Sequence, residues 1–257
     1  MKILKDIYQY RELLKTNVQK EIRGKYKGSF LGVLWSFINP LLQVAVYAIV
    51  FPYIMRIQTD NYLIYLIIGI IPWNFFITVI NQGMITVRMN AGIIKKVYFP
   101  REILPLSVAL SGLVNFFISS VIIILFCLIG GVGITWHIIL FPIIAIIQFF
   151  FTLGIVFAFS AINIYIKDTE YLIQFFLNLL FYATPILYQA ELFPESIRWI
   201  LYLNPMTQII MAYRNVFMYH TLPGPKGFLY LIILTILILY IGYKIFKKLE
   251  RGFAEEV

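Results

Sequence analysis

Six long apolar segments, each bounded by polar or basic residues, follow one another along the chain. Crossing the roughly 30 Å hydrocarbon core of a bilayer takes about 20 helical residues. Backbone N–H and C=O groups inside lipid must be paired within the element itself, which favours helices over strands for such segments. The pattern therefore predicts six membrane-spanning helices, at residues 30–55, 62–87, 103–129, 137–164, 171–187 and 228–246.

The N-terminal segment has a different pattern, in which apolar residues recur every three or four positions. On a helix they would form one stripe, with most of the lysines on other faces. A basic amphipathic helix of this kind lies in the membrane interface, although a solvated helix packed on another subunit would show the same pattern. The chain thus divides into an interfacial helix and hinge, residues 1–29, and a membrane domain, residues 30–257. The stripe consists of Ile3, Ile7, Tyr10, Leu14, Val18 and Ile22.

Glycines mark the junction between the interfacial helix and the first span. Gly28 and Gly32 lack side chains, so they permit turns and close packing that other residues resist. With Leu31 they form a predicted hinge. A helix-packing role for Gly32 would explain the same residue.

The stretch between the last two predicted spans contains two apolar pieces that are too short to cross a bilayer, WILYL at 199–203 and IIMAY at 209–213. Asn204 and Pro205 divide them, because proline disfavours helix in the residue before it. Residues 188–227 are therefore expected to form re-entrant or interfacial helices, with an ordinary extracellular loop as the alternative.

The basic residues predict the orientation. Most of the 21 Lys and Arg residues lie before the first span, in the loops 88–101 and 165–170, or after the last span. Cytoplasmic segments carry the excess of Lys and Arg, so both termini are expected in the cytoplasm of a multi-pass inner-membrane protein. The opposite side has only Arg56, Arg198, Arg214 and Lys226.

Composition agrees with a membrane protein and excludes several classes. The chain is 61% hydrophobic and 13% charged, against about 45–50% and 25% in soluble domains. Its net charge of +9 comes from residues that flank spans rather than from one patch, so nucleic acid is not an expected partner. Cys127 is the single cysteine, and His137 and His220 are the only histidines, so no disulfide within the chain and no metal site are expected.

Motifs for catalysis and nucleotide binding are missing from the sequence. It has no G-x-x-x-x-G-K-[ST], H-E-x-x-H or G-x-S-x-G, so we do not expect an enzyme. All twelve Asp and Glu residues lie outside the interiors of the predicted spans. Proton-coupled transport and charge-selective ion conduction are both disfavoured, because they generally need ionisable groups there.

The spans contain uncharged amides and aromatic rings instead. Amides bind hydroxyl groups and aromatic faces pack against sugar rings, so the set suits a polar, uncharged solute. The same amides could link helices by hydrogen bonds, and the rings could simply pack. The channel-lining candidates are Phe37, Tyr47, Phe175, Tyr182, Asn39, Gln43 and Asn178.

The loop from Arg88 to Arg101 is predicted to contain a short helix, which Asn90 would cap and Pro100 would stop. Its apolar residues recur at helical spacing, and an exposed apolar face is costly unless something covers it. The cover could be a partner protein or lipid headgroups. The apolar residues are Ile93, Ile94 and Val97.

Three segments, in this order and spacing, resemble the membrane subunits of type-2 ABC exporters for bacterial surface polysaccharides, and O-antigen exporters of the Wzm type most of all. They are RGKYKGSFLGVLW at 23–35 with NPL at 39–41, KKVYFPREILP at 95–105, and LNPMT at 203–207 with Tyr213 and Arg214. Teichoic acid and capsule exporters are near relatives. A membrane-embedded enzyme acting on lipid-linked sugars remains an alternative from another class.

The resemblance implies an all-α channel made by two copies of the chain, with short periplasmic helices before the last span. Each copy would bind a cytoplasmic ABC ATPase subunit, which binds ATP and Mg, so the chain itself needs no cofactor. The substrate would be a lipid-linked polysaccharide that is threaded out through the pore. Membrane lipids would be a further partner of the chain. The implied ATPase contacts are Ile93, Ile94, Lys95, Lys96, Val97 and Tyr98, with a smaller contact at Lys167 and Asp168.

Overall fold

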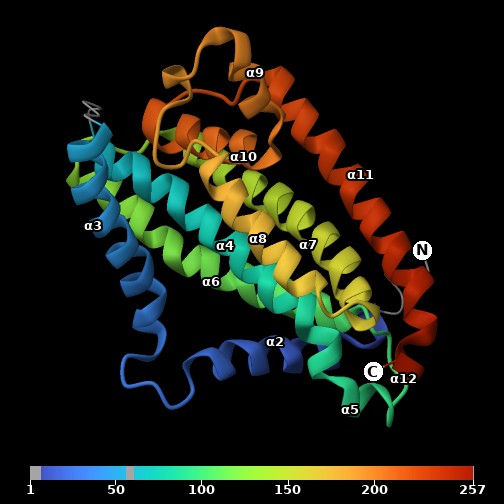
Figure 1. Ribbon diagram of the computed structural model, residues 1–257. Coiled ribbons are helices and arrows are strands. Elements are labelled where there is room, and N and C mark those ends of the chain that lie inside the picture. The colour runs from blue at the N-terminus through green and yellow to red at the C-terminus, as the bar shows by residue number, and fades with distance from the viewer. Residues whose placement is uncertain (1–6, 56–60, 257) are drawn as a thin grey trace.

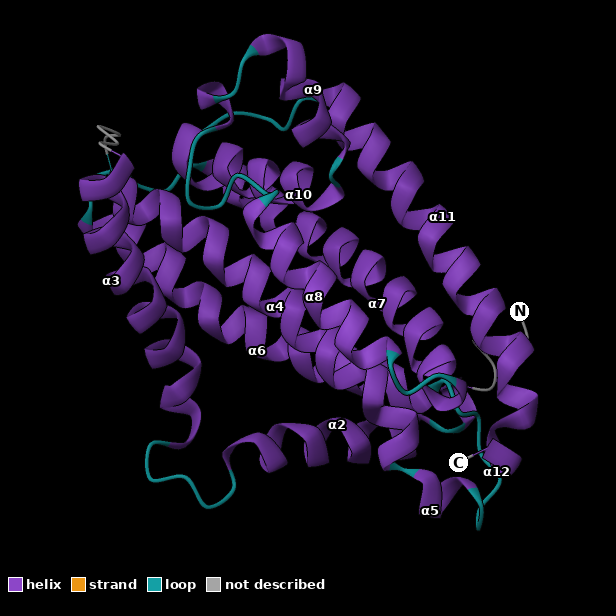
Figure 2. Ribbon diagram, viewed as in Figure 1, coloured by secondary structure: helices purple, strands orange, loops and turns teal. Residues whose placement is uncertain are grey.

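The computed structural model describes residues 7–55 and 61–256, and in these ranges the chain forms helices and connecting segments without strands (Figure 2). The described part contains five helices long and apolar enough to cross a bilayer. The all-helical prediction is confirmed, and five of the six predicted spans have full-length counterparts. Their α-helices are α3 (Trp35–Met55), α4 (Tyr62–Met89), α6 (Ile103–Ile129), α7 (Phe141–Tyr165) and α11 (Pro225–Leu249).

The segment predicted as a span at residues 171–187 is shorter than expected. Its helix, α8, runs over Thr169–Tyr182. Fourteen residues rise only about 21 Å, less than the roughly 30 Å of the hydrocarbon core. Pro185 disfavours helix at Thr184, and there the chain turns back along the end of the bundle. The prediction of a full-length helix to residue 187 is therefore wrong.

Two other predicted spans begin with tighter turns. A 3₁₀ turn at Gly32–Leu34 precedes α3, so residues 30–34 are not α-helical. Another 3₁₀ turn, Trp136–Leu140, precedes α7. The last span is longer than predicted at both ends, and the third matches its predicted bounds.

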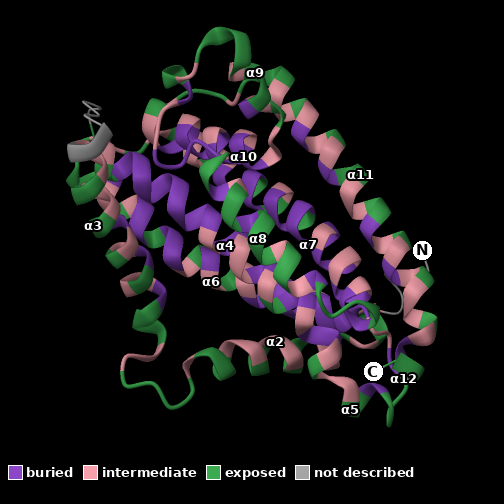
Figure 3. Cartoon of the chain, in the orientation of Figure 1, coloured by how far each residue is buried: buried purple, intermediate pink, exposed green. Residues whose placement is uncertain are grey.

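Helix α4 forms the centre of the bundle. It contacts α3, α6, α7 and α8, and most of its length is buried (Figure 3). A helix that is apolar on every side belongs in a protein core. Helices α3 and α11, by contrast, expose much of their apolar surface.

Short helices occupy the two ends of the bundle (Figure 1). Helix α2 (Arg11–Tyr26) runs across one end, where α5 (Ala91–Ile94) and α12 (Phe253–Glu256) also lie. At the opposite end are α9 (Glu195–Leu203), α10 (Pro205–Arg214) and a π-helical turn, Asn215–Tyr219. The predicted break is confirmed: Asn204 Oδ1 accepts a hydrogen bond from Met206 N at 3.0 Å, which caps α10.

Helices α7 and α11 approach closely because glycines face each other. A Cβ atom added to Gly154 would lie 2.7 Å from the Leu239 Cα, and a Cβ added to Gly242 would overlap the backbone of Gly154. Side chains at these positions would push the two helices apart.

We expect Gly154→Ala to lower the free energy of unfolding by about 1–3 kcal/mol, the usual cost of overpacking. The measurement is the thermal unfolding midpoint of the purified protein in detergent. Gly24→Ala is the matched control, because Gly24 is helical and has no atom within 4 Å of an added Cβ. Equal midpoints for the two variants would contradict the close-packing argument.

Candidate functional site

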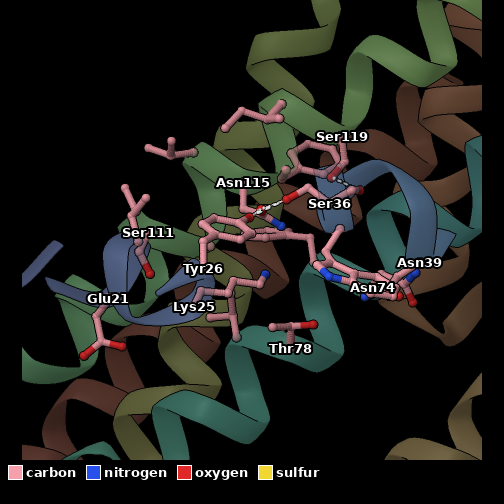
Figure 4. A pocket seen from close by; sticks show the side chains of 18 of the residues that line it. Glu21, Lys25, Tyr26, Ser36, Asn39, Asn74, Thr78, Ser111, Asn115 and Ser119 are labelled. Carbon is pink, nitrogen blue, oxygen red and sulfur yellow. Dashed lines mark hydrogen bonds between the residues drawn. The ribbon is translucent and has the colours of Figure 1, made fainter. Parts of the chain in front are cut away.

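A polar cavity of about 640 Å³ lies where α2 crosses beneath α3, α4 and α6 (Figure 4). Hydroxyl and amide groups from three membrane-spanning helices line it. Polar groups inside an apolar bundle are costly unless they are hydrogen-bonded, so the cavity is suited to water or a polar ligand. These groups belong to Ser36, Asn39, Asn74, Thr78, Gln82, Ser111, Asn115 and Ser119.

A hydrogen-bond network attaches the end of α2 to the bundle. The Tyr26 hydroxyl is bonded to Ser36 Oγ and donates to Asn115 Oδ1. Ser36 Oγ also lies 2.6 Å from Asn115 Oδ1, and Ser119 Oγ donates to the Ser36 carbonyl at 3.1 Å. One side chain of α2 therefore joins α3 to α6 at the edge of the cavity.

Helix α2 also contributes charge to the cavity. Figure 4 shows Lys25 reaching in between Tyr26 and Thr78, while Glu21 lies farther out. Partial burial lowers the pKa of the Lys25 ammonium from its ordinary value. No carboxylate of residues 7–55 or 61–256 lies within ion-pair distance of this ammonium. The cavity can thus bind hydroxyl-rich or anionic groups.

The turn between α2 and α3 requires its glycines. Gly28 has φ +77° and Gly32 φ +50°, in the left-handed region that side chains disfavour. Ser29 Oγ accepts hydrogen bonds from Gly32 N at 3.3 Å and Trp35 Nε1 at 3.1 Å. No described atom lies within 4 Å of a Cβ added at Gly32, so within one chain its role is conformational rather than packing. A hinge movement here, with Leu31 between the glycines, stays a prediction.

The channel-lining candidates lie on α3 and α8, and two of those on α3 contact residues that were not selected. The Tyr47 ring on α3 lies 6.1 Å from that of Phe181 on α8, and Gln43 accepts a hydrogen bond from Asn74 at 3.0 Å. Phe175 and Tyr182 are 59% and 67% exposed, so α8 leaves rings uncovered (Figure 3).

The remaining channel-lining candidates include both exposed and partly buried residues. Asn39 and Asn178 are exposed, whereas Phe37 is partly buried against the core. Phe181 is a link between α3 and α8 that the selection of candidates missed. Its place among deep aromatic residues was the only signal in the sequence.

The loop 88–101 contains a helix, as predicted, but α5 covers only Ala91–Ile94 and most of the loop is irregular. Helix α4 continues to Met89, and α5 is a single turn. The Asn90 side chain does not cap α5, because its Nδ2 donates to the Thr86 carbonyl at 2.8 Å and closes α4 instead. Gly92 also weakens helix, so the prediction of a longer capped helix is wrong.

The apolar face of this loop also differs from the predicted one. Ile94 is only 5% exposed and belongs to the core, so it does not present its side chain outward. Ile93, Val97 and Tyr98 are 47%, 58% and 91% exposed. The outward face therefore consists of these three residues, beside exposed Lys95 and Lys96.

The second loop at this end exposes both residues predicted to make a contact. Lys167 and Asp168 lie at the surface just before α8. The following carboxylate is paired, because Arg88 Nη2 lies 2.8 Å from Glu170 Oε2. This ion pair joins the loops 88–101 and 165–170, so the two predicted contacts share one end of the bundle.

Arg214 lies in a position that the charge pattern did not reveal. We counted it among outer loop charges, yet it is 3% exposed. It donates to the carbonyls of Pro185 at 2.7 Å and Ile186 at 3.1 Å. Its guanidinium carbon lies 3.4 Å from the centre of the Tyr65 ring. Carbonyl groups and a ring therefore surround this cation, a position that the count of charges on each side of the membrane does not indicate.

Comparison with known proteins gives a consistent result. The sequence profile described as ABC-2 type transporter matches residues 12–218. The chain is 34% identical over 259 residues to the O-antigen export system permease protein RfbA of Myxococcus xanthus, with 100% of each chain covered. It is 37% identical over 251 residues to the protein of the same name from Klebsiella pneumoniae, covering 95% of this chain and 94% of that one. The polysialic acid transport protein KpsM of Escherichia coli is 22% identical over 238 residues, covering 91% and 92%.

We expect Tyr26→Phe to loosen α2 from the bundle, since it removes one hydroxyl from the network. A lost hydrogen bond costs about 1 kcal/mol, which corresponds to roughly a fivefold larger open population. Limited trypsin cleavage after Lys25 and Lys27 should accelerate by that factor, because such cleavage follows the open population. Tyr8→Phe is the control, since the Tyr8 side chain is 69% exposed. Equal cleavage rates would show that the network does not hold α2.

Proposed function

Because the chain belongs to the ABC-2 type transporter family, we propose that it is the membrane channel subunit of an ATP-driven exporter of lipid-linked O-antigen-type polysaccharide. It is a multi-pass integral protein, and its proposed location is the bacterial inner membrane. The observation that carries the proposal is the end-to-end match to an O-antigen export permease at 34% identity. Both sequences are covered completely, so the proposal concerns the whole chain.

The proposed topology has six crossings. Helix α8 and the segment after it, up to residue 187, would make the fifth crossing, and residues 188–224 would form a re-entrant cap on the outer side. The places of α2 and α12 at one end of the bundle support two cytoplasmic termini, because an even number of crossings returns the chain to its starting side (Figure 1). Helix α2 would then lie in the cytoplasmic interface.

The pore would form between two copies of the chain. Helix α8 buries only Thr169, Leu177 and Phe181, and α3 leaves many apolar side chains exposed. Large uncovered apolar surfaces indicate lipid or protein contacts, and pairing by twofold symmetry is the commonest closed assembly. Amides and rings on these faces would offer a passing polysaccharide both hydrogen bonds and stacking surfaces.

A separate cytoplasmic ATPase would drive transport and bind ATP and Mg. The sequence has no phosphate-binding loop of its own. The outward face of Ile93, Val97 and Tyr98 would dock on this partner, with Lys167 and Asp168 beside it. The Arg88–Glu170 ion pair would keep both loops in one contact surface.

The alternatives are less well supported. A capsule exporter shares the architecture, and the KpsM similarity of 22% is the observation in its favour. An enzyme acting on lipid-linked sugars would need free acidic groups. The sequence has two close acid pairs. In the pair Asp168 and Glu170, Arg88 binds Glu170, and in the pair Glu191 and Glu195 both carboxylates are exposed surface charges.

We expect the double variant Phe175→Leu/Tyr182→Leu to lower export about tenfold, because each ring contributes about 0.5–1.5 kcal/mol to contacts. The measurement is surface polysaccharide in cells that co-express the chain and its ATPase, with polymer retained inside counted separately. Phe150→Leu, on the exposed side of α7, is the control. Undiminished export by the double variant would argue against this lining, and normal surface polymer in cells without the chain would overturn the exporter assignment.

We expect Val97→Asp to abolish stimulation of the partner's ATP hydrolysis and leave the membrane domain folded. A charge at an exposed docking position disrupts the contact and costs the isolated fold little. Ile94→Asp should instead lower the thermal unfolding midpoint, since it buries a charge in the core. Co-purification, ATPase rate and the unfolding midpoint distinguish the two. A Val97→Asp chain that still co-purifies with its ATPase and stimulates it would exclude this loop as the coupling contact.

A further inference from the structure

A second, smaller cavity surrounds Arg214 at the end of the bundle opposite α2. Its volume is about 200 Å³, below the roughly 300–1,000 Å³ of pockets for drug-sized ligands. A ligand of one sugar ring matches this size better. The polar and aromatic side chains that line the cavity are Tyr65, Gln189, Glu191, Arg214, Asn215 and Tyr219.

The walls of this cavity are held in place by strong contacts. Arg214 Nη2 donates to the Tyr65 carbonyl at 3.4 Å, in addition to its bonds with the Pro185 and Ile186 carbonyls. The Tyr65 hydroxyl donates to the Tyr188 carbonyl at 2.6 Å. A side chain at Gly69 would crowd the guanidinium, since an added Cβ would lie 3.1 Å from Arg214 Nη2. The site is therefore formed before any ligand binds.

Several polar groups of the cavity remain free for a ligand. Arg214 is 3% exposed, and its Nε is buried without a hydrogen-bond partner among the described residues. Over the same ranges, 7–55 and 61–256, no side-chain hydrogen bond engages the amides of Gln189 and Asn215 or the carboxylate of Glu191. Arg214 Nε is a buried donor that lacks a partner, and a ligand that supplies hydroxyl groups could also engage the partly buried amides of Gln189 and Asn215 and the exposed carboxylate of Glu191.

The charges of the cavity select the kind of ligand. Glu191 would repel an anion, and Arg214 would repel a cation. A neutral ligand with adjacent hydroxyl groups can accept from the guanidinium and amides and donate to the carboxylate. Tyr219 is 50% exposed, which leaves its ring available to stack on the apolar face of a sugar.

The geometry points to a binding subsite for a single neutral pyranose residue of the exported polysaccharide, at the outer end of the subunit. This inference rests on the proposed function for its substrate class. Arg214, Gln189 and Asn215 donate to ring hydroxyls, Glu191 accepts from them, and Tyr219 stacks on the ring.

Saturation-transfer NMR on the purified full chain in nanodiscs tests the subsite without requiring transport. The neutral probes are methyl α-glucopyranoside, methyl α-mannopyranoside, methyl β-galactopyranoside and N-acetylglucosamine, and glucuronate is the acidic probe. We expect at least one neutral probe to bind, and Glu191→Gln and Tyr219→Leu each to weaken that binding about tenfold. Glu195→Gln is the matched control, because Glu195 is exposed at the start of α9 and does not line the cavity.

Three results would overturn the subsite: no neutral probe binds, glucuronate binds at least as well as the neutral probes, or binding persists unchanged in both variants. Arg214→Lys tests separately whether Arg214 holds the cavity walls in place. It should lower the thermal unfolding midpoint, because lysine cannot reproduce the hydrogen bonds of the guanidinium to the Pro185 and Ile186 carbonyls. Export with no sugar binding would refute the subsite alone. Sugar binding through these residues without polysaccharide export would refute the proposed function alone.

Discussion

Pairing of backbone polar groups is the constraint on which the rest of this structure depends. Inside lipid each peptide group has to find a partner in the protein, and α-helices provide one for nearly every residue. The informative places are those where the helix stops. At some of these places in the described chain, polar side chains take over the pairing.

The segment after α8 is the clearest case. Arg214 binds the carbonyls of Pro185 and Ile186, and the hydroxyls of Tyr62 and Tyr65 bind those of Leu187 and Tyr188. Four consecutive carbonyl groups are thereby satisfied by side chains from two other helices. The early end of α8 is thus compensated by side chains, of which Tyr65 and Arg214 also line the smaller cavity. In the α2–α3 turn a single side chain provides the pairing: Ser29 Oγ accepts hydrogen bonds from the backbone N–H of Gly32 and from the indole N–H of Trp35.

The sequence was sufficient for the parts of the fold that depend on long apolar runs. The spans at 103–129 and 62–87 were predicted with small errors, since a long apolar run is enough to predict a helix. Burial depends on packing as well, because α4 and α11 have the same mean hydropathy and α4 alone is mostly buried. The sequence was insufficient where a single residue determines the end of a helix, or where packing determines which of two adjacent residues is buried. Pro185 ended α8, and Asn90 closed α4 rather than starting a helix. Ile94 and Ile93 are adjacent and equally apolar, so only packing distinguishes the buried one from the exposed one. The cavity beneath α3, α4 and α6 depends on polar residues far apart in the chain, and its existence follows from how the helices meet.

Arg214 also imposes an order on biogenesis under the proposed topology. Its cationic side chain has to reach the outer half of the membrane during synthesis, and its acceptors at Tyr65, Pro185 and Ile186 all precede it in the chain. Those acceptors are already synthesised when the arginine leaves the ribosome, so α10 can dock as soon as it is translocated. A chain that stops before residue 214 lacks the donor that binds the carbonyl groups of Pro185 and Ile186. The contact therefore joins a donor near the end of the chain to acceptors that are synthesised earlier.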